Sequence, residues 1–250
     1  MTAPTNERLR SAVTSAGFTY ETLAEHLGVD PKTVQRWITV GRVPHRTHRL
    51  RVAEALGNDD SFLWPSTASD PLSRSASQAE LVTIYQNRGS VPVDLWLDLI
   101  GRAEQNIDIL AFAATFLSDA LPDAHELIRE RALAGVQVRF LLGRPDSDSV
   151  RQRGNEEGIG DLLSSRCALS WSHVKRIADT AGIEARAHDT TLYASMFRFD
   201  NVLLANHHLW GAPAAQSPVL HLARIPGGRL FTNHMASYER IWDQAQPYPA

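Results

Sequence analysis

The sequence predicts an α+β protein of two domains, an all-helical N-terminal domain and a C-terminal α/β domain. Residues 1–65 carry short amphipathic helix patterns, whereas helix and strand patterns alternate from residue 91 onward. The stretch between them, "STASDPLSRSASQAE", is rich in Ser, Ala and Asp and has no periodic apolar pattern. We therefore expect domains at 1–65 and 91–250, joined by a linker over residues 66–90.

Composition narrows the class of protein. The single cysteine, Cys167, excludes an intrachain disulfide and favours a reducing cytoplasm. No apolar run is long enough to span a bilayer, so no membrane partner is expected. A net charge of -3 does not by itself indicate nucleic acid, so the local distribution of charge matters more than the sum.

Four helices are expected in the N-terminal segment, over "RLRSAVTSAG", "TYETLAEHLG", "DPKTVQRWI" and "HRTHRLRVAEALG". Gly28 can end the second helix as a left-handed cap, and Asp30 with Pro31 is a strong start signal for the third. Val34, Trp37 and Ile38 would face inward. A helix, a short turn and a second helix with a polar outer face is the plan of a helix-turn-helix.

The outer face of this segment is basic. No acidic residue lies between Lys32 and Arg51, and a strip of this kind suits phosphate neutralisation on DNA. The run "TYETLAEHLGVDPKTVQRWITVGRVP" resembles the lambda-repressor-like (XRE-type) helix-turn-helix family, which implies side chains facing bases from the third helix and phosphate contacts after it. The expected contacts with double-stranded DNA are Lys32, Thr33, Gln35, Arg36, Arg42, Arg46 and Arg49.

The C-terminal segment reads as an α/β sheet. The patterns "VDLWLDLIGRAEQNIDILAF" and "HELIRERALAGVQVRFLL" each join a helix to a buried strand. "GIEARAH" and a hairpin over 192–206, turning at Asp200-Asn201, add strands, and "NHMASYERIWDQA" closes the domain as a helix. The polar stretch "PDSDSVRQRGNEEGIG" is interpreted as a loop that covers a site.

This pattern resembles one half-unit of the phospholipase D-like superfamily, in which two units normally form one site, so the resemblance implies a homodimer. The family's chemistry needs a His, a Lys two residues on and an Asp five beyond that. Asp200 fits the last position, but Tyr193 and Ser195 stand in the first two. A neutral Tyr is a weak nucleophile and Ser carries no positive charge, so a degenerate, non-enzymatic domain is expected.

The sequence therefore favours a DNA-binding transcriptional regulator, with a C-terminal domain that dimerises and senses a small or anionic effector. The expected ligand pocket consists of Arg144, His188, Tyr193, Ser195, Arg198 and His207. The main alternative is a DNA-targeted phosphodiesterase or nuclease using His188 or the pair His207 and His208. A third hypothesis is a module that docks another protein. No cofactor is expected, and no metal, because no HExxH or comparable spacing occurs.

Overall fold

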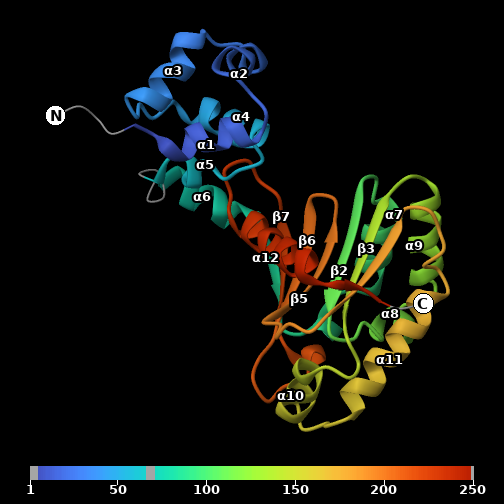
Figure 1. Cartoon of the computed structure of the whole chain (residues 1–250). Coiled ribbons are helices and arrows are strands. Elements are labelled where there is room, and N and C mark those ends of the chain that lie inside the picture. The colour runs from blue at the N-terminus through green and yellow to red at the C-terminus, as the bar shows by residue number, and fades with distance from the viewer. Residues whose placement is uncertain (1–4, 66–70, 249–250) are drawn as a thin grey trace. The chain divides into compact units, whose positions relative to one another are not determined.

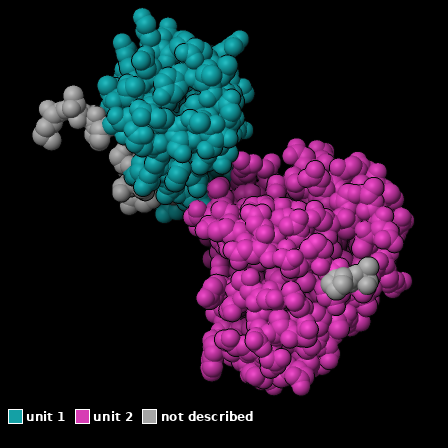
Figure 2. Space-filling view, viewed as in Figure 1, with its two compact units in different colours: residues 1–78, 225–229 teal, residues 79–224, 230–250 magenta. Residues whose placement is uncertain are grey.

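The computed structural model describes residues 5–65 and 71–248 of the chain. Contacts within the chain divide it into two compact units (Figure 2). Unit 1 contains residues 1–78 and 225–229, and unit 2 contains residues 79–224 and 230–250. None of the helices in the described part of the chain is long and apolar enough to cross a membrane.

Unit 1 is helical, as the sequence predicts. Its elements are α1 (Glu7–Ser15), α2 (Tyr20–Leu27), α3 (Pro31–Thr39), α4 (Arg46–Ala55), α5 (Asp60–Leu63) and most of α6 (Pro71–Glu80). Gly28 ends α2 with a φ of 67°, in the left-handed region where glycine avoids steric cost. The Asp30 side chain then caps α3 by accepting the N–H of Lys32 at 2.8 Å. Val34, Trp37 and Ile38 are buried, as expected.

The predicted linker over 66–90 is largely ordered structure. Residues 71–80 form α6, residues 81–85 form strand β1 (Leu81–Tyr85), and residues 88–90 form the short helix η2 (Arg88–Ser90); residues 66–70 lie outside the described part. Strand β1 pairs antiparallel with β7 (Val219–Ala223). The prediction failed because the partner of this strand lies more than a hundred residues away, beyond the reach of any local pattern.

Unit 2 contains an eight-stranded mixed sheet with strand order β1-β7-β6-β5-β2-β3-β4-β8 (Figure 1). Strands β2, β3 and β4 are parallel, and the other neighbours pair antiparallel. The remaining elements are α7 (Val93–Arg102), β2 (Asn106–Ala111), α8 (Phe116–Asp119), α9 (Ala124–Leu133), β3 (Gln137–Gly143), α10 (Asp148–Glu156), α11 (Leu162–Lys175), β4 (Ile183–His188), β5 (Ala194–Phe199), β6 (Val202–His207), η3 (Ala214–Gln216), α12 (Leu230–Gln244) and β8 (Gln246–Pro247).

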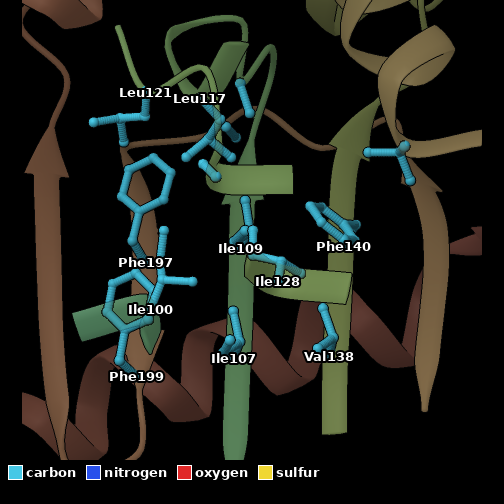
Figure 3. Packing of buried hydrophobic residues seen from close by; sticks show 14 of the residues in the cluster. Ile100, Ile107, Ile109, Leu117, Leu121, Ile128, Val138, Phe140, Phe197 and Phe199 are labelled. Carbon is cyan, nitrogen blue, oxygen red and sulfur yellow. The ribbon is translucent and has the colours of Figure 1, made fainter. Parts of the chain in front are cut away.

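Helices cover both faces of the sheet. Successive side chains along a strand therefore pack in turn against one face and then the other. Ile107 and Ile109 of β2 pack with Ile100 of α7 in one hydrophobic cluster, part of which Figure 3 shows. Leu110 packs in a second cluster with Met235 of α12. This period of two is the pattern expected of strands buried on both faces, and it places α12 on the face opposite α7 and α9.

The predicted covering loop "PDSDSVRQRGNEEGIG" is instead mostly helix α10. The Ser147 hydroxyl caps it by accepting the N–H of Val150 at 3.3 Å. Gly154 lies so close to the turn that follows that a Cβ there would collide with the carbonyl oxygen of Gly160. Glycine disfavours helix formation locally, but Gly154 is required within α10 because the following turn packs directly against it.

Candidate functional site

Asp200 has a structural role at the tip of the β5–β6 hairpin. It adopts a φ of 51°, which confirms the predicted tight turn. Its carboxylate accepts the backbone N–H groups of Glu104, Gln105 and Asn106 at 2.8, 2.8 and 2.7 Å. Burial acts to raise the pKa of Asp200, but the three N–H donors and the Arg198 charge outweigh it and lower that pKa.

Tyr193 and Ser195 do not share one site, contrary to the expected pocket. Tyr193 precedes β5, is 83% exposed and lies at the rim of one pocket. Ser195 is buried beside a separate cavity, with its Oγ 3.0 Å from Nε2 of His208. The alternation that places residues two apart on one face applies inside a strand, and Tyr193 lies before the first residue of β5.

Two of the arginines predicted to line the pocket are paired elsewhere. Nε of Arg144 forms an ion pair with Asp189 at 3.1 Å. Nη1 of Arg198 donates to the buried carboxylate of Asp108 at 3.0 Å, and its Nε donates to the carbonyl of Asp200 at 2.9 Å. Both guanidinium groups are thus engaged by neighbouring groups of the fold, which corrects their assignment to the ligand pocket.

His188 is also engaged by the surrounding backbone. It is 2% exposed, its Nε2 lies 3.2 Å from the carbonyl oxygen of Ala111, and its Nδ1 accepts the N–H of Thr190 at 3.3 Å. Burial lowers the pKa of His188 to about 4. With both ring nitrogens occupied and little exposure, His188 cannot reach a substrate, so it is excluded as the nucleophile.

A pair of histidines forms a different candidate site. His207 at the end of β6 and His234 in α12 approach each other with their Nε2 atoms 3.4 Å apart. They line a pocket of about 520 Å³, within the usual range for ligand sites. The same pocket is lined by the polar residues Thr190, Thr191, Tyr193, Asn233, Ser237, Arg240 and Gln244.

The protonation of this pair follows from its contacts. His234 Nδ1 lies 2.6 Å from the carbonyl oxygen of Leu230, which can only accept, so this nitrogen carries a proton. Only one further proton fits between the two facing Nε2 atoms. Burial, and then the positive charge of His234, lower the pKa of His207. The neutral form of His207 is therefore favoured.

His234 was not identified from the sequence. The pattern "NHMASYERIWDQA" predicts the helix that carries His234, but it does not connect this residue with a residue of another element. His207 was named, yet nothing local connects it with a residue 27 positions later. The usable signal would have been a second histidine near the start of a helix that packs on the β5–β6 hairpin.

In unit 1, most of the predicted DNA contacts are accessible. Lys32, Gln35, Arg36 and Arg42 are exposed, while Thr33 and Arg46 are half-buried. Arg49 is the exception, because its side chain is buried, and this corrects its predicted contact with DNA.

Arg49 is only 7% exposed, and its Nε lies 3.5 Å from a carboxylate oxygen of Asp60, whose side chain is also buried. Arg49 therefore joins α4 to α5 and cannot hold a phosphate.

Within the described ranges, no group of three or more His, Cys, Asp or Glu side chains is placed to hold a metal ion.

Comparison with known proteins identifies no relative by sequence: no protein-family model and no curated protein matches. Solved structures do match. A phospholipase D family member, Nuc from Salmonella typhimurium, has 18% identity and a TM-score of 0.44, covering 67% of this chain and 99% of its own. The archaeal chromatin protein TrmBL2, described with a novel mode of DNA binding, has 13% identity and a TM-score of 0.44, covering 88% and 72%. NucT from Helicobacter pylori has 9% identity and a TM-score of 0.40, covering 66% and 98%.

The prediction of a non-enzymatic transcriptional regulator is corrected by the geometry of the chain itself, in which two imidazoles line one pocket. Its physical basis was also incomplete. That prediction looked for the catalytic imidazole at residue 193, where the sequence motif places it, and left His188 and the pair His207 and His208 to the alternative. The structure instead supplies imidazoles from the end of β6 and from α12.

Proposed function

We propose that the chain is a DNA-targeted phosphodiesterase whose active site is the pocket around His207 and His234. The observation that carries the proposal is the contact between their two Nε2 atoms, 3.4 Å apart, on the wall of a pocket of about 520 Å³. One imidazole that is neutral and one that holds a proton are the two groups that phosphodiester cleavage requires. Arg240, exposed on the same pocket, can neutralise a phosphoryl oxygen.

The proposed reaction has two steps. As the phosphodiester enters, the contact between the two Nε2 atoms opens. The Nε2 lone pair of His207 then attacks phosphorus, the bond from phosphorus to the leaving oxygen breaks, and the proton on His234 Nε2 passes to that oxygen. In the second step His234 takes a proton from water. The hydroxide formed attacks phosphorus, the bond to His207 breaks, and both side chains return to their starting states.

We propose DNA as the substrate because of the basic surface of unit 1. Lys32 and Arg36 of α3 are exposed, and Arg42 follows in the turn after this helix. No acidic residue lies between positions 32 and 51 to oppose them. Cations grouped in this way bind phosphates and raise the local concentration of DNA. On this proposal unit 1 binds double-stranded DNA through its helix-turn-helix, and unit 2 cleaves phosphodiester bonds.

The test is steady-state hydrolysis of bis(4-nitrophenyl) phosphate and of plasmid DNA by the full chain. The chain contains a matched control, because His125 and His173 form another histidine pair. Their ring centroids are 5.4 Å apart, as are those of His207 and His234, although the first pair is stacked and the second is T-shaped. We expect His207→Ala/His234→Ala to reduce turnover to background and His125→Ala/His173→Ala to retain it. Equal turnover by the two double variants would show that the pocket around His207 and His234 is not the active site.

DNA binding by unit 1 is tested separately. Replacing Arg36 with alanine removes an exposed cation from α3 and is expected to weaken binding to duplex DNA by about 1–3 kcal/mol. Arg10→Ala is the matched control, because Arg10 is an exposed arginine of α1 outside the basic strip. Fluorescence anisotropy with a labelled duplex at fixed salt measures both, and unchanged affinity for Arg36→Ala would contradict the DNA-binding role of α3. A homodimer and a small-molecule effector stay predictions of the sequence.

A further inference from the structure

A second cavity in unit 2 has a different character from the histidine pocket. It has a volume of about 60 Å³ and lies among η2, η3, α11 and the ends of β5 and β6. Its polar lining consists of Arg88, Thr115, Glu157, Arg166, Ser195 and His208. His207 and His234 do not line it, so it is separate from the proposed active site.

Positive charge exceeds negative charge in the wall of this cavity, where two arginines accompany one acidic residue. Glu157 is the acidic residue in its wall, and its carboxylate already accepts Nε of Arg153 at 2.8 Å. The guanidinium of Arg88 stacks over the Phe116 ring at 4.5 Å, and among the described residues it has no ion pair. Burial lowers the pKa of Arg88 to about 10; the nearby carboxylate of Glu157 opposes this lowering, and the charge of Arg166 adds to it. A half-buried cation beside a second arginine is stabilised by a bound anion.

The neutral polar groups in the wall are arranged to complement such an anion. His208 Nδ1 donates to the carbonyl of Leu192 at 3.2 Å, so its Nε2 is the accepting nitrogen of a neutral ring. Burial and the charges of Arg153 and Arg88 lower the pKa of His208 to about 4, which keeps the ring neutral. The Ser195 hydroxyl therefore donates to His208 at 3.0 Å, and it can turn to donate to a ligand oxygen.

The size of the cavity limits the ligand. At about 10–15 Å³ for each water molecule, the cavity holds about four to six waters. That is the number of heavy atoms in one orthophosphate ion and far fewer than in a nucleotide. We propose that this cavity is a binding site for inorganic phosphate, held between Arg88 and Arg166 with Ser195 as a hydroxyl donor.

The proposal is tested by isothermal titration of sodium phosphate at constant ionic strength. The parent protein is the full-length His207→Ala/His234→Ala/Arg240→Ala variant, so that binding in the histidine pocket and hydrolysis do not contribute. We expect saturable binding of one phosphate per chain, weakened by about tenfold or more in Arg88→Gln. Arg102→Gln, in which an exposed arginine of α7 is neutralised, should bind as the parent does.

Arg166→Gln provides a second variant, because Arg166 is exposed and its replacement does not disturb the core. It should also weaken phosphate binding, and Arg88→Lys should bind more tightly than Arg88→Gln because the charge is kept. Phosphate binding unchanged in both Arg88→Gln and Arg166→Gln, or absent from the parent, would overturn the proposal. Neither result depends on whether the histidine pair catalyses hydrolysis.

Discussion

Replacing His207 with alanine is expected to lower kcat for phosphodiester hydrolysis by about 10²–10⁴-fold, the range that a positioned catalytic group contributes. KM should change little, because Arg240 and the hydroxyl groups of the pocket remain to bind the phosphodiester. His234→Gln should lower kcat over a similar range, because the leaving oxygen loses its proton donor. Stopped-assay kinetics with bis(4-nitrophenyl) phosphate separate kcat from KM. A variant that raises KM alone would show that His207 binds the substrate and does not attack it.

The pH dependence adds a second readout for His207. Because the pKa of His207 is lowered and attack requires the neutral ring, the acid limb of kcat/KM should have its midpoint below the ordinary histidine value of about 6.5. Burial is the larger cause of the lowering, and the charge of His234 is the second. His234→Gln removes the second cause. The acid limb of kcat/KM for the residual activity should therefore have its midpoint at a higher pH. An acid limb above pH 7 in the unmodified chain would contradict the assignment.

Replacing Asp108 with alanine is expected to destabilise unit 2 by about 3–5 kcal/mol, the usual effect of leaving a buried ion pair without one partner. Asp108 is 1% exposed, and its two carboxylate oxygens accept Nε of Arg139 at 2.6 Å and Nη1 of Arg198 at 3.0 Å. Through Arg139 the network continues to Glu239 of α12, at 2.9 and 2.7 Å. The substitution therefore removes the carboxylate that balances the positive charges of Arg139 and Arg198 next to the core.

The matched control for this prediction is Asp98→Ala. Asp98 pairs with Arg102 at 3.0 Å on α7, but both side chains are more than half exposed. Exposed pairs contribute about 0–1 kcal/mol, so this variant should unfold almost as the parent does. Urea unfolding followed by tryptophan fluorescence measures both variants. A loss below about 1 kcal/mol for Asp108→Ala would mean that Arg139 and Arg198 are satisfied without this carboxylate.

The elements that sequence reasoning predicted well are those stabilised within a few residues. Helix α3 begins after the N-cap Asp30 because the Asp30 side chain accepts the N–H of Lys32 and Pro31 has no N–H that needs a partner. The turn at Asp200 likewise depends on the tolerance of an Asp residue for a positive φ. Strands β2 and β3 were visible as apolar runs, because both of their faces are covered.

Other features were decided only by tertiary structure, because the interacting groups are far apart in the chain. Strand β1 depends on β7, and the burial of Arg49 depends on Asp60 in the next helix. The histidine pair joins residues 207 and 234 through the packing of α12 on the hairpin. Local sequence determined the helices, the turn and most strands of this protein. Which side chains meet was determined by packing between elements, because contacts across the sheet carry no local periodic signal.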